Sequence, residues 1–460
     1  MRAALIVGTI CLARAALAWE GDTAAGIVEQ AAIGAKLHER LVRVHGRALG
    51  GYDLLAVTRS AAPILHDKLG LVSPSSALTP DRRGRLQAQA WLAAGAVLEG
   101  IPAARMRHHF YDPVKKQGLS GKEVSGLTKL TVGSAPALGK GQAAPDWLVS
   151  EENDLGLPRF WKELELSATA RTPSARDRHL AFALIGAGAM TALVADSGVP
   201  SRVRLDAGAH LDSLGPASDD RGSRFERIAA LVFGRLGVPA SSGVRRERLR
   251  DFISADDGKG LADLTYRHWY SEGTLPREID APPGRPIRAE RKALADRVAK
   301  TQRIAEPRPR ELDLDAARSA TGGRVLDADG TCLAAYNVDM ERRLVWSIPD
   351  ECALDQLRVI LPLTVGYATG FLEWLFRGEL VVETAGDRVT VRPRATLGAG
   401  KLRVLVEDAA GVRREIGAAD SKDGGASLDA PGAGGGRITA VFVGVDARGE
   451  TVVAIGTQAR

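Results

Sequence analysis

The most distinctive segment of the sequence reads WLAAGAVLE at residues 91–99, RHHFYDP at 107–113 and Gly-Leu at 118–119. Its first part ends an amphipathic helical pattern over 85–98 with a carboxylate, Glu99. His109 follows ten residues later, in a turn that also contains Asp112. Imidazole and carboxylate groups are zinc ligands and usually come from several elements of a fold. An aspartate beside such a histidine can orient its ring from the second shell. By itself, the stretch is equally compatible with a surface loop holding a hydrogen-bonded histidine.

The composition around this stretch is that of a globular protein. Of the 460 residues, 45% are hydrophobic and 26% are charged, which excludes a mostly disordered chain. The length allows two or three domains. The net charge of +6 is spread along the chain rather than massed, so it does not by itself indicate nucleic-acid binding.

Helical periodicity predominates from Trp19 to about residue 377. Ser174 is the predicted N-cap of a long Ala/Leu-rich helix that ends near Asp196. The most apolar internal stretch is 357–376. Polar residues and Pro362 within or beside it favour a buried core helix over a membrane span, so no transmembrane segment is expected.

After Gly378 the pattern changes to short β-branched runs separated by Gly and Asp turns. We expect strands at 379–384, 387–394, 401–407, 437–445 and 451–455, and a mobile loop at 421–436. The predicted fold class is therefore mainly α, with a helical domain at 19–378 followed by a small, all-β, sandwich-like domain at 379–460.

Residues 1–18 have the pattern of a signal peptide, with Arg2, a short apolar run and an Ala-Leu-Ala cleavage site. Cleavage would leave Trp19 as the first residue and place the protein outside the cell or in the periplasm or cell envelope. It would also leave only Cys332 and Cys352. These two are expected to form a disulfide in an exported chain; the alternative is two separate buried thiols.

Two other motifs are weak. Residues 133–140 resemble a phosphate loop, but their glycines are one residue too far apart and Gly141 stands where a Ser or Thr is needed. The pair Gly186 and Gly188 is better explained by close helix packing than by dinucleotide binding.

The chain resembles the secreted zinc-dependent phospholipase C family and the related single-strand nucleases. The resemblance rests chiefly on His-Phe-Tyr-Asp-Pro at 109–113 with the following Gly-Leu, and on a mature chain that begins with Trp. Residues 192–202 and 222–226 resemble the family's later ligand segments. The resemblance covers about 19–378 and implies an all-helical fold with a three-zinc cleft.

Carried over to this chain, the resemblance implies metal ligands at Trp19, Glu99, His109, Asp196 and Glu226. Four family histidines are replaced, at Ala24, Ala192, Arg202 and Gly222. One zinc site with three donors could remain, since a protein zinc site needs about three or four. Zinc is therefore a possible cofactor, with at most one well-supported site.

Arg202 cannot bind a metal, because a guanidinium has no free lone pair at working pH. It could instead pair with Asp196 or Glu226, so an ion-pair network could have replaced the zinc cluster. Arg202 and Arg204 could also face an anionic ligand.

We therefore expect a degenerate zinc cleft that binds rather than cleaves a phosphodiester, such as a phospholipid headgroup. The alternatives are a weak zinc-dependent phosphodiester hydrolase and a structural or envelope-adhesion role centred on the β domain.

Overall fold

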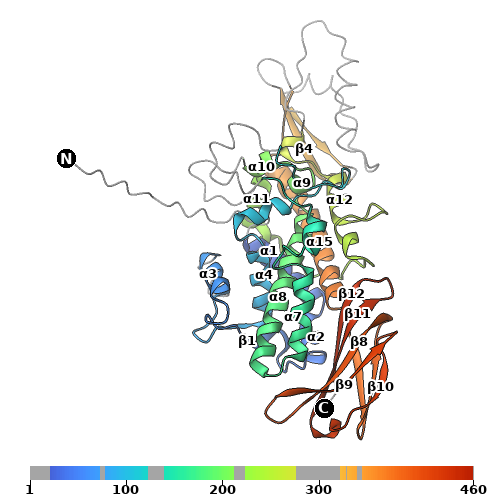
Figure 1. The fold of residues 1–460 in the computed structure, drawn as a ribbon. Coiled ribbons are helices and arrows are strands. Elements are labelled where there is room, and N and C mark those ends of the chain that lie inside the picture. Colours follow the sequence, from blue (N-terminus) through green and yellow to red (C-terminus); the bar gives the residue numbers. More distant parts are fainter. Residues whose placement is uncertain are drawn as a thin grey trace, which may run out of the picture.

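The structure is a computed structural model that describes residues 21–72, 78–122, 139–211, 223–275, 322–327, 329–338 and 344–458. The described residues form a helical body followed by an all-β part, which confirms the predicted fold class (Figure 1). The proposed leader at 1–18, Trp19, the loop at 133–138 and Gly222 lie outside the described residues.

Long helices form the centre of the helical body: α1 (Gly21–Gly34), α4 (Ala88–Leu98), α7 (Leu157–Thr169), α8 (Pro173–Asp196) and α15 (Asp350–Leu375). Helix α8 is the central one, because it packs against the other four. By length and composition, α8 is also the one helix among the described residues that could cross a membrane. Within the protein, however, 89% of its most apolar window is buried, as in the core helix of a globular fold.

Helices α4 and α8 cross at unusually short range because glycines face the partner backbone. A Cβ atom added to Gly95 would lie 2.0 Å from the carbonyl oxygen of Ile185, and one added to Gly188 would lie 1.9 Å from that of Leu92. No side chain fits at those distances. Gly188 therefore serves helix packing, as the sequence indicates.

Shorter elements complete the helical body. They are α2 (Leu37–Arg43), β1 (Leu54–Ala56), α3 (Pro63–Val72), β2 (Arg85–Gln87), α6 (Ala144–Val149), α9 (Pro200–Val203), α10 (Ala207–Leu211), α11 (Arg224–Leu236) and α12 (Leu261–His268). Helices α9, α10, α11 and α12 gather at one end of the bundle, and the β part lies toward the other end (Figure 1).

A small antiparallel sheet packs on α15, which the helical pattern of the sequence does not predict. Its strands are β3 (Gly322–Leu326), β4 (Cys332–Val338) and β5 (Leu344–Ser347), in the order β3-β4-β5. The predicted disulfide is present and joins Cys332 on β4 to Cys352 on α15. The side chain of Gln356 adds two 3.0 Å hydrogen bonds to the carbonyls of residues 332 and 333.

The C-terminal part consists of two antiparallel sheets, ordered β12-β11-β8-β9 and β10-β7-β6. The strands are β6 (Leu380–Ala385), β7 (Arg388–Pro393), β8 (Leu397–Glu407), β9 (Arg413–Ser421), β10 (Ala426–Asp429), β11 (Arg437–Asp446) and β12 (Thr451–Thr457). Side chains from both sheets, such as Val391 and Phe442, share one apolar core. Strand β10 lies in the segment expected to be a loop, because its pattern Ala-Ser-Leu-Asp is short and polar.

Apolar contacts and ion pairs join the two parts. Val441 and Ile455 belong to the apolar core of the helical body. The Arg377 guanidinium stacks 3.9 Å from the ring of Trp374 and donates to Asp446 at 3.0 Å. These contacts therefore hold the β part against the end of the bundle opposite α9, α10, α11 and α12.

Candidate functional site

Five charged residues singled out in the sequence converge where several helices end. Glu99 caps the C-terminus of α4, His109 follows a 3-10 turn over Ala103–His108, and Asp196 is the last residue of α8. Arg202 lies in α9, and Glu226 lies in the first turn of α11. All five are at most 4% exposed. They therefore form a buried cluster rather than the lining of an open cleft.

His109 lies between two carboxylates. Its Nδ1 atom is 2.5 Å from Oδ2 of Asp196, and its Nε2 atom is 3.5 Å from Oε1 of Glu99. The first distance is a short hydrogen bond, and the second is an ion-pair contact at the outer limit of hydrogen bonding. Burial by itself would lower the pKa of His109, but Asp196 and Glu99 together raise it above its ordinary value. The geometry thus favours an imidazolium between two carboxylates.

Glu99 is held by groups that no sequence motif marks. Its Oε2 atom accepts a 2.6 Å hydrogen bond from Nη2 of Arg105, and its Oε1 atom accepts a 3.0 Å bond from the indole of Trp147. Burial would raise the pKa of the Glu99 carboxyl, but Arg105 and His109 hold it below the usual value. Arg105 also donates to Asn153 at 2.7 Å. Glu99 is therefore a buried, ionised carboxylate with both oxygens engaged.

Arg202 is fully buried and pairs with Glu226, with 3.3 Å between Nη2 and Oε1. The guanidinium carbon lies 4.5 Å from the ring centroid of Phe110, which is a cation–π contact. Glu226 also forms a capping box with Ser223, in which each side chain bonds the other residue's backbone N–H. Burial raises the pKa of Asp196, and Glu226 adds to that rise, whereas His109 and Arg202 oppose it. The two halves of the cluster are therefore electrostatically linked.

The charges of this cluster balance. Three buried carboxylates, on Glu99, Asp196 and Glu226, face three cations, on Arg105, His109 and Arg202. Arg105 also pairs with a fourth carboxylate, that of Asp154, at 2.6 Å, but the Asp154 side chain is exposed to solvent. A buried carboxylate without a partner would be strongly destabilising. The three cations therefore provide, from within the protein, the compensation that bound metal ions provide in a metal site. We call these six residues the buried ion-pair cluster.

The arrangement does not fit a zinc site. Zinc needs neutral imidazole nitrogen and carboxylate oxygen at about 2.0–2.2 Å, all directed at one point. Here both ring nitrogens of His109 face carboxylates, and Glu99 is bonded to Arg105 and Trp147. Among the described ranges, no group of three His, Cys, Asp or Glu side chains is arranged to hold a metal ion.

The remaining predicted site residues have packing roles. Arg204 is buried, donates to the carbonyls of Trp269 and Tyr266, and stacks on the Tyr266 ring at 4.5 Å. Asp112 accepts hydrogen bonds from the backbone N–H groups of residues 114 and 115, both at 2.9 Å, and so shapes the turn after His109 rather than touching the ring.

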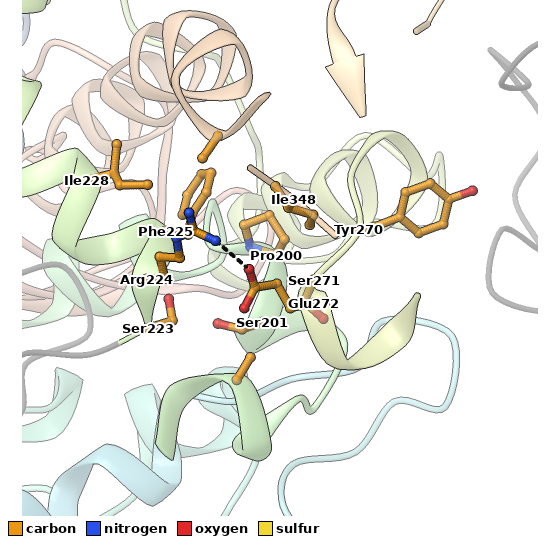
Figure 2. A pocket seen from close by; sticks show the side chains of 12 residues that line it. Pro200, Ser201, Ser223, Arg224, Phe225, Ile228, Tyr270, Ser271, Glu272 and Ile348 are labelled. Atoms are coloured by element: carbon orange, nitrogen blue, oxygen red, sulfur yellow. Dashed lines mark ion pairs between the residues drawn. The ribbon is translucent and has the colours of Figure 1, made fainter. Parts of the chain in front are cut away.

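A small cavity lies next to the cluster (Figure 2). Its volume is about 30 Å³, which is enough for ordered water. Ser201 and Ser223 line it, and Figure 2 shows the ion pair between Arg224 and Glu272, with 3.5 Å between Nη1 and Oε1. The Ser201 hydroxyl is buried, with no hydrogen-bond partner within the described part of the chain. The cavity has room for ordered water beside the Ser201 hydroxyl.

No protein-family model matches the chain, and no curated protein is significantly similar to it. Two solved structures match the chain at low identity and low TM-score. One is the alpha-toxin of an avian strain of Clostridium perfringens, at 10% identity and TM-score 0.26, covering 96% of this chain and 98% of the toxin. The other is the alpha toxin of Clostridium absonum, at 11% identity and TM-score 0.25, covering 96% of this chain and 94% of the toxin. Any functional conclusion therefore rests on this chain's own side-chain contacts.

Proposed function

We propose that this is an exported, non-catalytic protein that binds a phosphodiester-type ligand, and that the buried ion-pair cluster stabilises its fold in place of a zinc centre. The observation that carries the proposal is the charge balance at the cluster. Glu99, His109 and Asp196, the donors of the one possible zinc site, are already paired with one another or with Arg105. A metal ion would have to displace these cations before it could bind or activate water.

The disulfide supports export. Disulfides persist in oxidising compartments and are rare in the cytosol. The bridge between Cys332 and Cys352 ties the β3-β4-β5 sheet to α15, the helix that leads into the β part. Phosphodiester binding is supported by the resemblance of residues 91–119 to zinc-dependent phospholipases C and nucleases, and the ligand would contact surfaces outside the buried ion-pair cluster.

A release assay tests the absence of catalysis. Purified full-length protein, supplied with zinc, is incubated with phosphatidylcholine vesicles and with single-stranded DNA, alongside His109→Gln. We expect both proteins to release phosphodiester products at the same background rate, and vesicle co-sedimentation to show binding without turnover. Zinc-dependent release that is lost in His109→Gln would overturn the proposal.

The second candidate is a weak zinc-dependent phosphodiester hydrolase. One observation favours it: the side chains of Glu99 and Asp196 both lie within 3.5 Å of the His109 ring, although the three groups are paired with one another and not directed at one point. Zinc binding there would require His109 to lose its proton and Glu99 to leave Arg105. The same assay separates the two candidates, because only this one predicts release that a chelator abolishes.

A further inference from the structure

A polar cavity lies between the helical body and the β part, at the opposite end of α8 from the buried ion-pair cluster. Its volume is about 130 Å³. The helical side is formed by the segment after α2, the end of α7 and the start of α8, and the β side by β8, β9, β11 and β12. Helix α8 has 24 residues, which at about 1.5 Å per residue places the two sites roughly 35 Å apart.

The cavity carries more positive than negative charge. Four arginines line it, Arg47, Arg176, Arg413 and Arg437, against two carboxylates, Asp177 and Glu407. Asp177 is paired with Arg47, at 2.6 Å. The other carboxylate is shared, since one oxygen of Glu407 accepts from Arg176 at 3.0 Å and from Arg413 at 2.7 Å. The protein therefore leaves an excess of two positive charges in a partly buried space.

Arg437, on β11, accounts for much of this excess. Its side chain has no hydrogen bond or ion pair with the described residues, and its Nε atom is buried. The guanidinium lies against Gly46, where an added Cβ atom would come within 2.4 Å of it. A glycine at that position lets the guanidinium approach the helical side.

The arginines repel one another. Burial lowers the pKa of Arg413 to about 10, and Arg176 and Arg437 add to that effect. Burial also lowers the pKa of Arg176. A guanidinium held in this space without a counter-charge is costly, and a bound anion would remove that cost.

The cavity has the size for a small anion. Arg176 and Arg413 already donate to backbone carbonyls as well as to Glu407, so the donors left for an anion are those of Arg437 and the Nε atom of Arg47. A cavity needs about 10–15 Å³ open to a water-sized probe to hold one water, so 130 Å³ accommodates a group of four oxygens about one central atom. Helix α8 begins at the cavity with Pro173, and the positive end of its dipole adds to the field there. Arginine forks match the oxygens of phosphate in geometry.

We propose that the cavity between α8 and β11 binds a tetrahedral oxyanion, either inorganic phosphate or the terminal phosphate of a phosphomonoester, with Arg437 as its main ligand. The bound anion would lock the β part against the helical body. This inference does not depend on the proposed function, because none of its residues belongs to the buried ion-pair cluster.

Calorimetric titration of the full-length protein tests the proposal, with inorganic phosphate and glycerol 3-phosphate as separate probes at constant ionic strength. The test variant is Arg437→Met. The matched control is Arg414→Met, on β9 of the same sheet but exposed and outside the cavity. We expect saturable binding at one site per chain, weakened about tenfold or more in Arg437→Met and unchanged in Arg414→Met.

Stability without anion separates binding from a structural role. Arg437→Met removes a repulsive charge, so its Tm in chloride is expected to equal or exceed that of the native chain, while the Tm increase caused by phosphate is lost. If only inorganic phosphate binds, the ligand of the cavity is the free anion. If glycerol 3-phosphate binds as well, the cavity also accepts phosphomonoesters. Absence of saturable binding, or equal affinity in Arg437→Met, would overturn the proposal.

Discussion

The Nδ1 atom of His109 and the Oδ2 atom of Asp196 lie 2.5 Å apart, although 87 residues of chain separate them. The contact joins the turn after α4 to the end of α8, the central helix. Glu99 on the other side of the ring makes His109 the bridge between two buried carboxylates. The two carboxylates therefore stabilise a positive charge on the His109 ring in this arrangement.

Removal of that charge is expected to destabilise the fold. His109→Gln leaves Asp196 and Glu99 facing a neutral side chain, and breaking a buried pair typically costs about 3–5 kcal/mol. Urea unfolding measures the loss. The control His268→Gln changes a partly buried histidine that has no ion pair with a carboxylate of the described residues, and should cost less than about 1 kcal/mol. Equal losses in both variants would argue against the bridging role.

Arg202 is expected to be coupled to Glu226. Arg202→Met removes the cation that lies against Glu226 and near Asp196, with an expected loss of about 3–5 kcal/mol. Adding Glu226→Gln, which keeps the capping-box geometry, should recover about 1–3 kcal/mol of it. The exposed pair of Arg358 and Asp355 is the matched control, since Arg358→Met should cost under about 1 kcal/mol. Strict additivity in the double-mutant cycle would refute the coupling.

Replacement of glycine by alanine is expected to change the stability in opposite directions at two positions, Gly188 and Gly234. Gly188→Ala forces a methyl group against the carbonyl of Leu92, so a loss of at least about 1–3 kcal/mol is expected. Gly234→Ala, inside α11 with open space around the added methyl, should gain about 0.5–1 kcal/mol from helix propensity. Thermal unfolding of both variants checks the contrast, and a stable Gly188→Ala protein would mean that α4 and α8 pack less closely.

The free energy of unfolding is expected to fall at acidic pH because of His45. Burial, with Arg47, Arg40 and Arg413, lowers the pKa of this histidine from 6.5 to about 3. Below pH 6.5 the unfolded chain therefore binds a proton that the folded protein does not, and stability falls as the pH falls. Between pH 6.5 and 5 this amounts to about 2 kcal/mol. Urea midpoints at the two pH values should differ less in His45→Gln than in the native chain, and identical differences would contradict the lowered pKa.

Much of the helical body can be predicted because its long helices carry strong apolar patterns. The predicted helix at 357–376 lies almost entirely within α15. The long helix ending at Asp196 is also present, but its N-cap is Thr172 rather than Ser174. Pro173 explains the difference, since proline is favoured in the first turn and its fixed φ starts the helix one position after Thr172.

The features that the sequence does not predict depend on long-range contacts. The strand β4 follows a stretch of mainly helical sequence pattern, and its position on α15 is fixed by the disulfide and by Gln356. Arg105 and Trp147 complete the environment of Glu99, but nothing in their spacing marks them, because Trp147 is 48 residues away. The sequence indicates which charged residues belong to the site. It does not indicate which of them form ion pairs, because that depends on how the ends of several helices come together in the fold.

Zinc stoichiometry is the most direct test of the buried ion-pair cluster. The full-length protein is exposed to excess zinc, desalted and assayed by elemental analysis, next to Glu99→Gln. With Glu99, His109 and Asp196 already neutralised by protein cations, both proteins should retain well below one zinc per chain. One or more zinc ions per chain in the native protein, lost in Glu99→Gln, would contradict the replacement of a zinc centre by protein cations.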